Sequence, residues 1–537
     1  MKRSAAHDRW GLAVGAAFLA LYAATAARGL QFADSGELQS VALLGGIPHA
    51  TGYPLWVALA RAFSWLPLGE PEFRVTLFSA VCGAAALGLL VRRLGELGVA
   101  PFASVAAAGF LGLTFSFWRI SVRAEVYTLG LLTALVALGA LVAARAASPS
   151  AWAARRAALL LGLVLTVHLA FAPAVAVAGL GLAWREWRAA PRELARLPLL
   201  LAAFALGLSP YLLLVALDAS GIRANYLDLV RENAAFMGHA VPPLETPWQG
   251  VRWLLTGRNL HPPPPFELHP RSVVAMLPDC GAVLFLFELG PLALPLLLAG
   301  LVRAWRKDRP PALVLAVAFL ATVGFAAWLQ FGAMLHLFLL PACLIGAILA
   351  AFGLEALLGV ARLSGPRRAA VAVAACLALA AAPAGLRVFA ERHPIGPREW
   401  RVIEEDAEFR SALLPAVARD AGAGAWADSA LERFPEGALV LASWSYYTPL
   451  RHRQLVDGRR PDLTLRQILV GTLAPRVRGW QRDHVPAGAP IVLVAERARL
   501  SALLPAADSL ALPGGRVAWV LRRPVPDSLL EEARPGR

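Results

Sequence analysis

Two acidic side chains follow the first apolar stretch of the chain, in the segment Asp34-Ser35-Gly36-Glu37. His49 comes soon after them, in a turn-forming segment that continues to Tyr53. A carboxylate can accept a proton, so Asp34 is a candidate general base for a hydroxyl group that attacks a sugar carbon. Glu37 is a candidate second acid beside it. A simpler interpretation is a capping box, in which Asp34 and Glu37 cap the start of a helix.

A second polar group lies between two apolar stretches and contains Arg119, Arg123, Glu125 and Tyr127. The charge pattern of the loops places it on the outer side of a membrane, where arginine is uncommon. Because a guanidinium fork matches the oxygens of a phosphate, we expect Arg119 and Arg123 to bind a donor phosphate. Tyr127, beside them in sequence, is a further candidate for this donor site. Glu125 is a candidate second acid, or a partner that holds an arginine. The alternative is a structural ion pair beside an interfacial aromatic ring.

Two histidines and two aromatic residues complete the candidate site. His168 interrupts a long apolar stretch, and His49 lies in a turn beside Pro48. Each is a candidate ligand of the donor phosphate, although a lone histidine among apolar residues is more often an ordinary residue of the core. Tyr53 and Trp253 are candidates for binding the acceptor, while membrane anchoring is the alternative for Trp253. No spacing of His, Cys, Asp or Glu specifies a metal site.

The composition indicates a membrane protein. Of the 537 residues, 58% are hydrophobic and only 16% are charged, and the apolar stretches are long enough to cross a bilayer. The formal charge of +15 gathers as arginine in short loops, which sets membrane orientation and does not suggest nucleic acid. The four cysteines form no disulfide framework. The N-terminal apolar stretch has no convincing cleavage site, so we expect a retained first helix.

We expect about eleven membrane spans. They are residues 10–29, 73–91, 99–118, 126–144, 157–168, 170–184, 197–217, 281–302, 312–329, 335–358 and 369–386. Residues 157–184 are too long for one upright helix, and His168 and Pro173 favour a break there. With that break, the arginine clusters fall on one side, so the N-terminus is expected in the cytoplasm and the C-terminus outside. The bias toward Ala, Arg, Leu and Gly favours the inner membrane of a bacterium.

The expected domains are a transmembrane domain, residues 1–387, and an extracytoplasmic domain, residues 388–537. The first carries two large outer loops, 30–72 and 218–280, and residues 54–66 suit a helix lying along the membrane. In the expected extracytoplasmic domain, short apolar runs at 438–442, 463–465, 491–494 and 517–521 alternate with helical stretches such as 473–482. That alternation predicts a small α/β domain with a partly parallel sheet.

Several of these segments together resemble a known family. They are Asp34-Ser35-Gly36-Glu37, His49 with Gly52-Tyr53-Pro54-Leu55, Arg123-Ala124-Glu125-Val126-Tyr127, Val167-His168-Leu169 and Phe338-Leu339-Leu340-Pro341. In the tail, Gly437-Ala438-Leu439-Val440-Leu441 and Gly458-Arg459-Arg460-Pro461-Asp462 also match. The family was formerly catalogued as a domain of unknown function. It is similar to the eukaryotic transmembrane protein O-mannosyltransferases and belongs with the GT-C membrane glycosyltransferases.

The resemblance implies an α-helical polytopic fold of the GT-C type. The donor substrate that it implies is a polyprenyl-phosphate-linked sugar, with mannose as the first candidate. No cofactor is implied with certainty. It also implies inversion at the anomeric carbon, Asp34 as base and Glu125 as a second acid. Arg123 and His168 would bind the donor phosphate. The acceptor would be an extracytoplasmic protein or glycan. Two other classes remain open: a transporter or lipid-sugar flippase, and a catalytically silent scaffold.

Overall fold

The computed structural model divides the chain into two compact units, each built from three separate segments. The helical unit comprises Met1–Ala26, Leu77–Tyr211 and Glu267–Val417, and the mixed unit comprises Ala27–Thr76, Leu212–Phe266 and Ala418–Arg537. The structure describes residues 5–145, 151–189, 196–234, 244–256, 270–329, 334–360, 365–367, 370–371, 373–378, 381, 422–468, 473–484, 490–495, 507–512, 516–522, 525–526 and 528. The first and second outer loops thus group with the tail, whereas the expected division into 1–387 and 388–537 stays a prediction.

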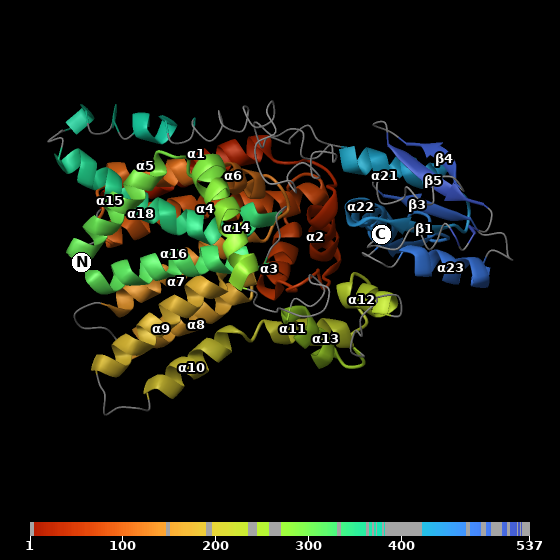
Figure 1. Cartoon of the computed structure of the whole chain (residues 1–537), viewed down its shortest axis with the longest axis horizontal. Coiled ribbons are helices and arrows are strands. Elements are labelled where there is room, and N and C mark those ends of the chain that lie inside the picture. Colours follow the sequence, from red (N-terminus) through yellow and green to blue (C-terminus); the bar gives the residue numbers. More distant parts are fainter. Residues whose placement is uncertain are drawn as a thin grey trace. The chain divides into compact units, whose positions relative to one another are not determined.

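The helical unit is a bundle of apolar helices (Figure 1). Its helices are α1 (Ala5–Thr25), α4 (Pro71–Glu96), α5 (Pro101–Leu113), α6 (Phe115–Ser121), α7 (Tyr127–Ala144), α8 (Ala151–Leu165), η1 (Leu169–Phe171), α9 (Ala172–Ala189), α10 (Arg196–Gly207), α14 (Pro270–Ala282), η2 (Val283–Glu288), α15 (Ala293–Lys307), α16 (Arg309–Leu329), α17 (Leu335–Phe338) and α18 (Leu340–Val360). The helices α4 and α11 (Tyr211–Ala219) continue into the mixed unit.

Within the described ranges, five helices are long and apolar enough to cross a membrane, or eight spans if each bent helix pair counts as one. The chain is therefore a multi-pass membrane protein, as its composition predicted. The predicted break at His168 is confirmed, because α8 ends at Leu165 and α9 begins at Ala172, and these helices pack side by side (Figure 1). The number of eleven spans stays a prediction, and the last, 369–386, lies largely outside the described residues.

Three spans expected as single helices are bent instead. The pair α5 and α6 bends by 72°, the pair α10 and α11 by 42°, and the pair Val273–Glu288 and Ala293–Lys307 by 99°. Glu288 joins the first and the last of these bends, since its Oε1 accepts from the Ser116 hydroxyl over 2.5 Å and its Oε2 from the Ser116 N–H over 3.2 Å. The carboxylate thus satisfies a backbone donor at the start of α6, which makes the break tolerable away from water.

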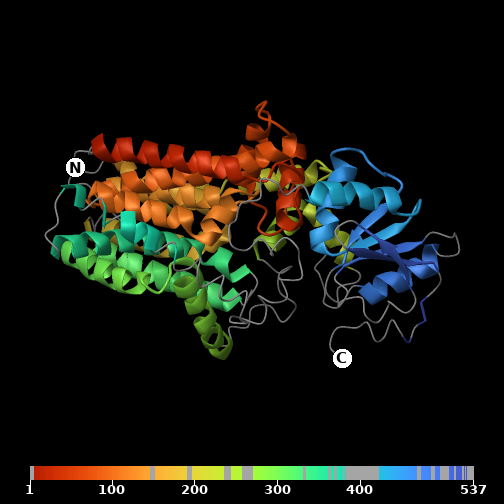
Figure 2. The ribbon, with the colours of Figure 1, turned by 90° about the horizontal axis from the view of Figure 1, so that it is seen from above.

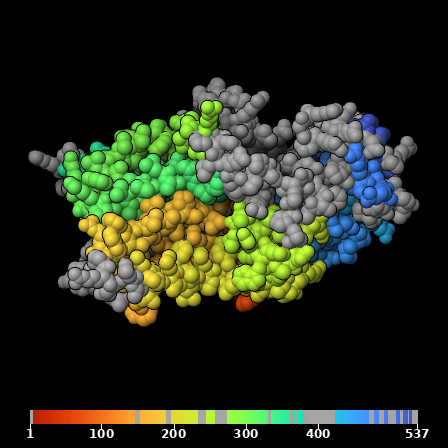
Figure 3. All heavy atoms as spheres, turned by 60° about the horizontal axis from the view of Figure 1, so that its bottom comes forward, coloured from red at the N-terminus to blue at the C-terminus, as the bar shows by residue number. Residues whose placement is uncertain are grey.

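Helices α9, α10 and α16 expose apolar side chains. In Figure 3 the yellow α9 and α10 and the green α16 contribute to one face of the molecule. Leu180 of α9 is 72% exposed, Leu201 of α10 is 69% exposed and Leu320 of α16 is 67% exposed. A contiguous apolar surface of this kind is typical of helices that face lipid.

The mixed unit contains a five-stranded sheet with the order β2-β1-β3-β5-β4 (Figure 2). Its strands are β1 (Leu439–Ala442), β2 (Thr464–Gln467), β3 (Ile491–Val494), β4 (Asp508–Ala511) and β5 (Val517–Leu521). β1 pairs in parallel with β2 and β3, whereas β5 pairs antiparallel with β3 and β4. The predicted partly parallel sheet is therefore confirmed, and β4 is a strand that the sequence did not reveal.

Helices cover both faces of this sheet. Alternate residues of β1 point to opposite faces. Val440 and Ala442 pack with α21 (Gly422–Arg433) and α22 (Trp444–Leu455), whereas Leu439 and Leu441 pack with α23 (Leu473–His484). Phe32 from the first outer loop joins the α21 side of this core, with its ring centroid 5.7 Å from that of Trp426.

The two outer loops form short helices of the mixed unit. They are α2 (Ala33–Leu44), α3 (Pro54–Ser64), α12 (Tyr226–Ala234) and α13 (Pro247–Leu255). A two-strand bridge joins the loops, since Ile47 N–H donates to Ala224 O over 2.8 Å and Tyr226 N–H donates to Ile47 O over 2.9 Å. This bridge brings Tyr226 toward the segment that carries His49.

Candidate active site

Asp34 and Glu37 lie in the first turns of α2, but they do not form a capping box. The helix begins at Ala33 after Phe32, and no side chain caps its first N–H groups. Ala33 has a φ of +51°, which a residue with a Cβ seldom adopts. The capping interpretation is therefore wrong, because both carboxylates make contacts elsewhere in the mixed unit.

A carboxylate, an imidazole and a second carboxylate stand in a row. Glu37 Oε1 accepts the His49 backbone N–H over 2.9 Å, and its Oε2 is hydrogen bonded to His49 Nδ1. The other ring nitrogen, Nε2, lies 3.8 Å from Asp34 Oδ2. The structure thus brings together Asp34, Glu37 and His49 as one proton-accepting group.

The environment of Glu37 is drier than that of Asp34. The Glu37 side chain is 11% exposed and the Asp34 side chain is 22% exposed. Burial raises the pKa of Glu37, and the contact with His49 opposes that rise. Asp34 is therefore the more accessible of the two carboxylates.

Trp444 is a member of this group that the sequence did not single out. It is the first residue of α22, directly after β1, and its Nε1 donates to Asp34 Oδ1 over 2.5 Å. The available signal was its position at the carboxyl end of a buried parallel strand, where functional side chains gather in α/β sheets.

Aromatic rings surround His49. The ring centroids of Tyr53, Trp444 and Tyr226 lie 5.3, 6.0 and 6.3 Å from the imidazole, each in an edge-on arrangement. The ring of Tyr447 stacks on that of Trp444, with the centroids 6.1 Å apart, and burial raises the pKa of Tyr447. These rings come from the first loop, the second loop and the tail, so all three segments build the surroundings of the imidazole.

The turn before α3 is shaped for this arrangement. Gly52 has a φ of +83° and Tyr53 a φ of +42°. A Cβ on Gly52 would lie 2.5 Å from the side chain of Leu214, so a larger residue does not fit. The Tyr53 hydroxyl donates to Ala50 O over 2.5 Å, which fixes the ring beside His49.

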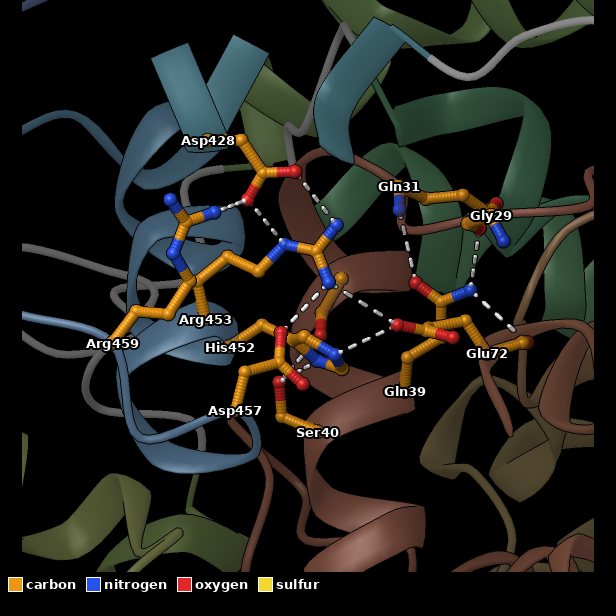
Figure 4. A network of polar contacts seen from close by, with 11 residues as sticks. Gly29, Gln31, Gln39, Ser40, Glu72, Asp428, His452, Arg453, Asp457 and Arg459 are labelled. Atoms are coloured by element: carbon orange, nitrogen blue, oxygen red, sulfur yellow. Dashed lines mark hydrogen bonds and ion pairs between the residues drawn. The ribbon is translucent and has the colours of Figure 1, made fainter. Parts of the chain in front are cut away.

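A network of hydrogen bonds joins α2 to the neighbouring segments of the chain (Figure 4). Gln39 is fully buried, and its Nε2 donates to Gly29 O over 3.0 Å and to Glu72 O over 3.2 Å. Its Oε1 accepts the Gln31 N–H over 3.0 Å. This side chain therefore closes the loop between Gly29 and α2 and fixes where the helix starts.

The donor-side candidates form a separate cluster within the helical unit. The centroids of the Tyr127 and His168 rings lie 4.5 Å apart, and Phe338 lies 5.9 Å from His168. His168 Nδ1 accepts the Ala170 N–H over 2.9 Å and so caps η1. This cap explains why the chain breaks at this histidine.

Arg123 and Glu125 lie close to this cluster in sequence. Arg123 is buried, whereas Arg119 and Glu125 are partly exposed. The backbone of Glu125 is fixed by Ser79, whose hydroxyl donates to Glu125 O and accepts Glu125 N–H, each over 3.0 Å. The proposed roles of Arg119, Arg123, Glu125, Tyr127 and His168 stay predictions.

Trp253 lies in the second loop, in α13. A capping box at Thr246 and Gln249 starts this amphipathic helix, and Trp253 is 4% exposed. Its acceptor role stays a prediction. Among the residues that the structure describes, no group of three or more His, Cys, Asp or Glu side chains could hold a metal ion.

The fold and the site define a class: a multi-pass membrane protein with a carboxylate–imidazole–carboxylate group on loops that pack with a small α/β domain. Residues 34–191 match the family described as the N-terminal domain of protein O-mannosyl-transferase TMEM260. That match begins at Asp34 and includes every candidate residue up to His168. Over this region the chain is similar to protein O-mannosyltransferases, as the resemblance of its motifs predicted.

One relative and two solved structures illustrate the similarity. Protein O-mannosyl-transferase TMEM260 of Mus musculus is 35% identical over 133 residues, which are 24% of this chain and 19% of the mouse protein. The chain thus matches about a fifth of the length of that relative.

ArnT from Cupriavidus metallidurans bound to undecaprenyl phosphate is 14% identical with a TM-score of 0.49, covering 95% of this chain and 97% of that chain. The archaeal oligosaccharyltransferase AglB from Archaeoglobus fulgidus, in complex with an inhibitory peptide and a dolichol-phosphate, is 15% identical with a TM-score of 0.49. That similarity covers 96% of this chain and 74% of that chain. The class therefore rests on the helices and on the sequence match.

Proposed function

We propose that this chain is a membrane glycosyltransferase that moves a sugar, with mannose as the first candidate, from a polyprenyl-phosphate donor to an extracytoplasmic acceptor. The observation that carries the proposal is Asp34, held by Trp444 on one oxygen and facing His49 on the other. It stands at the first residue of the stretch that matches an O-mannosyl-transferase domain. The location that follows is the inner membrane of a bacterium, with the N-terminus in the cytoplasm and the tail outside.

The proposed reaction is a single displacement with inversion. The acceptor hydroxyl oxygen forms a bond to the anomeric carbon, and the bond from that carbon to the phosphate oxygen breaks with its electron pair going to the phosphate. The hydroxyl proton goes to Asp34 Oδ2. His49, fixed by Glu37, stands next to the oxygen that receives this proton and stabilises its changing charge.

The remaining candidates fall into supporting roles. Arg123, Arg119, Tyr127 and His168 are proposed to bind the phosphate of the donor, because cations stabilise the negative charge that develops on the leaving group. Glu125 is proposed to hold an arginine or to act as a second acid. Tyr53 and Trp253 are proposed to bind the acceptor, which is a protein or a glycan.

A transporter or lipid-sugar flippase is the second candidate, because bent and broken spans are common in transporters. Here three helix pairs bend by 72°, 42° and 99°. The two candidates differ in a measurable way. A flippase moves an intact lipid-linked sugar across the bilayer, whereas a transferase cleaves the bond between sugar and phosphate.

The test uses the purified full chain in proteoliposomes with labelled polyprenyl-phosphate sugars and a mixture of extracytoplasmic acceptors. We expect cleavage of the donor with transfer of label, and a decrease of about 10²–10⁴-fold in Asp34→Asn, the range for loss of a general base. The matched control is Asp308→Asn, since Asp308 forms an exposed ion pair with Arg145. Normal transfer in Asp34→Asn would show that the base is elsewhere. Lipid movement without cleavage would identify a flippase.

A further inference from the structure

One face of the tail helix α22 lies against α2, the helix that carries Asp34. Trp444, Thr448 and His452 are spaced four residues apart and therefore share this face. Trp444 Nε1 donates to Asp34 Oδ1 over 2.5 Å, and His452 Nδ1 is hydrogen bonded to Ser40 Oγ over 2.9 Å. Between these bonds, Thr448 Oγ1 lies 3.1 Å from the place that a Cβ on Gly36 would take. The two helices are thus joined along their length.

The central contacts of this face are dry. His452 is fully buried, and Ser40 and Thr448 are also buried. His452 Nε2 lies 3.3 Å from Glu72 Oε1, so both ring nitrogens have partners (Figure 4). Buried polar pairs of this kind fix the register of two helices, because sliding either helix would leave donors and acceptors unmatched.

The neighbouring residues hold the same register. Arg453 follows His452 and forms ion pairs with Glu72 at 3.6 Å and with Asp428 of α21 at 3.0 Å. At the other end, Phe32 packs against both Trp426 and Tyr446 in the core of the tail, two residues before Asp34. The start of α2 is therefore anchored in the α/β domain on both sides of the catalytic carboxylate.

We propose that Trp444 is a positioning residue for Asp34 and that α22 makes the α/β domain a part of the catalytic centre. This inference rests on the proposed function, in which Asp34 is the base. The indole N–H binds Oδ1 and so orients Oδ2 toward His49 and the acceptor hydroxyl.

The first test replaces Trp444 in the full chain and measures kcat and KM for sugar transfer. Trp444→Phe keeps a ring but removes the donor, so we expect kcat to fall about 10–100-fold, the rate equivalent of one hydrogen bond to a charged group. The KM for the donor should stay within about two-fold, because Trp444 acts on the base and not on donor binding.

Two further variants isolate the N–H group. Trp444→His restores a ring N–H and should return kcat toward that of the wild type. If Trp444→Phe does not fold, replacement of Trp444 by β-(3-benzothienyl)alanine keeps the ring size and exchanges only the N–H for sulfur. The matched control is Trp519→Phe, a partly buried tryptophan on the α23 side of the same sheet, which should leave kcat at the wild-type value.

The outcomes separate this inference from the function on which it rests. If kcat of the variants that lack the N–H group equals that of the wild type, Trp444 does not position the base and the inference is wrong. If Asp34→Asn is fully active, the base assignment itself has failed, whatever the Trp444 variants do. Loss of activity in Asp34→Asn together with a lower kcat in Trp444→Phe that Trp444→His restores supports both.

Discussion

Glu37 holds His49 at two points, through the backbone N–H at 2.9 Å and through the ring nitrogen Nδ1. Two bonds to one carboxylate fix both the position and the rotation of the imidazole. The ring therefore keeps Nε2 directed toward Asp34 Oδ2, at 3.8 Å. A site that must accept a proton gains from such fixed neighbours, because no reorganisation is needed during the reaction.

Replacing Glu37 by Gln should therefore slow sugar transfer, although a side chain of the same size still occupies the position. The amide keeps the size of the side chain but cannot accept both hydrogen bonds from His49. We expect kcat for sugar transfer to fall about 10–100-fold, which corresponds to the roughly 1.5–3 kcal/mol of a hydrogen bond to a charged group. The control is Glu432→Gln, since Glu432 is 68% exposed and pairs only loosely with Arg459. Equal kcat values for the wild type and Glu37→Gln would show that the fixing of His49 by Glu37 does not contribute to catalysis.

The same residue predicts a dependence of stability on pH. Burial raises the pKa of Glu37 above its ordinary value of 4.5, so the folded chain holds this proton at pH values where the unfolded chain has lost it. The contribution of Glu37 to the free energy of unfolding should therefore decrease as the pH rises from about 4.5 through the raised pKa. Thermal melts of the wild type and of Glu37→Gln at several pH values measure this contribution. Parallel curves across that range would contradict the prediction.

Gly36 should be sensitive to the smallest enlargement. A Cβ at this position would lie 2.3 Å from Gln31 O, a backbone atom that cannot move aside easily, and 3.1 Å from Thr448 Oγ1. We expect Gly36→Ala to lower the free energy of unfolding by about 1–3 kcal/mol, the usual cost of an overpacked contact, and to lower Tm. Gly29→Ala is the control, because no atom lies within 4 Å of its added Cβ. Equal Tm values for the two variants would argue against the close packing of Gly36 against Gln31 and Thr448.

Arg123 should affect the donor more than the acceptor. If its guanidinium binds the donor phosphate, Arg123→Lys keeps the charge but loses the fork, and the KM for the lipid-linked donor should rise about ten-fold or more. The acceptor KM should change little. Arg303→Lys is the control, because Arg303 forms an exposed pair with Glu355. A donor KM that stays at the wild-type value in Arg123→Lys would assign Arg123 to structure alone.

The sequence predicted those elements whose pattern is local. The runs at 491–494 and 517–521 coincide with β3 and β5, because buried strands are short, apolar and bounded by polar loops. The strand β4 was missed, since its residues Asp508, Ser509 and Leu510 lie at an exposed sheet edge and show no apolar alternation. The bends at Thr114 and Gly290 were missed because they depend on the contact between Ser116 and Glu288, far apart in the chain.

The candidate site shows the same limit. Asp34, Glu37 and His49 could be found because they lie within one short segment and are chemically conspicuous among apolar residues. Trp444 and Tyr226 were missed, because they reach His49 only through the tertiary fold. One tail motif that carries the family resemblance has a structural role: Arg460 forms a fork with Asp462 and also binds the carbonyl of Phe434 beyond the end of α21. The Arg460 contact lowers the pKa of Asp462 to about 2.

The bond between Trp444 and Asp34 joins residues 410 positions apart in the chain. During synthesis the first outer loop leaves the ribosome long before the tail, so Phe32 and the face of α2 toward α22 lack their tail partners for most of that time. A newly made chain therefore carries Asp34 on an unfinished surface. Under the proposed function, the catalytic group is completed only when the tail folds, and a truncated copy lacks it.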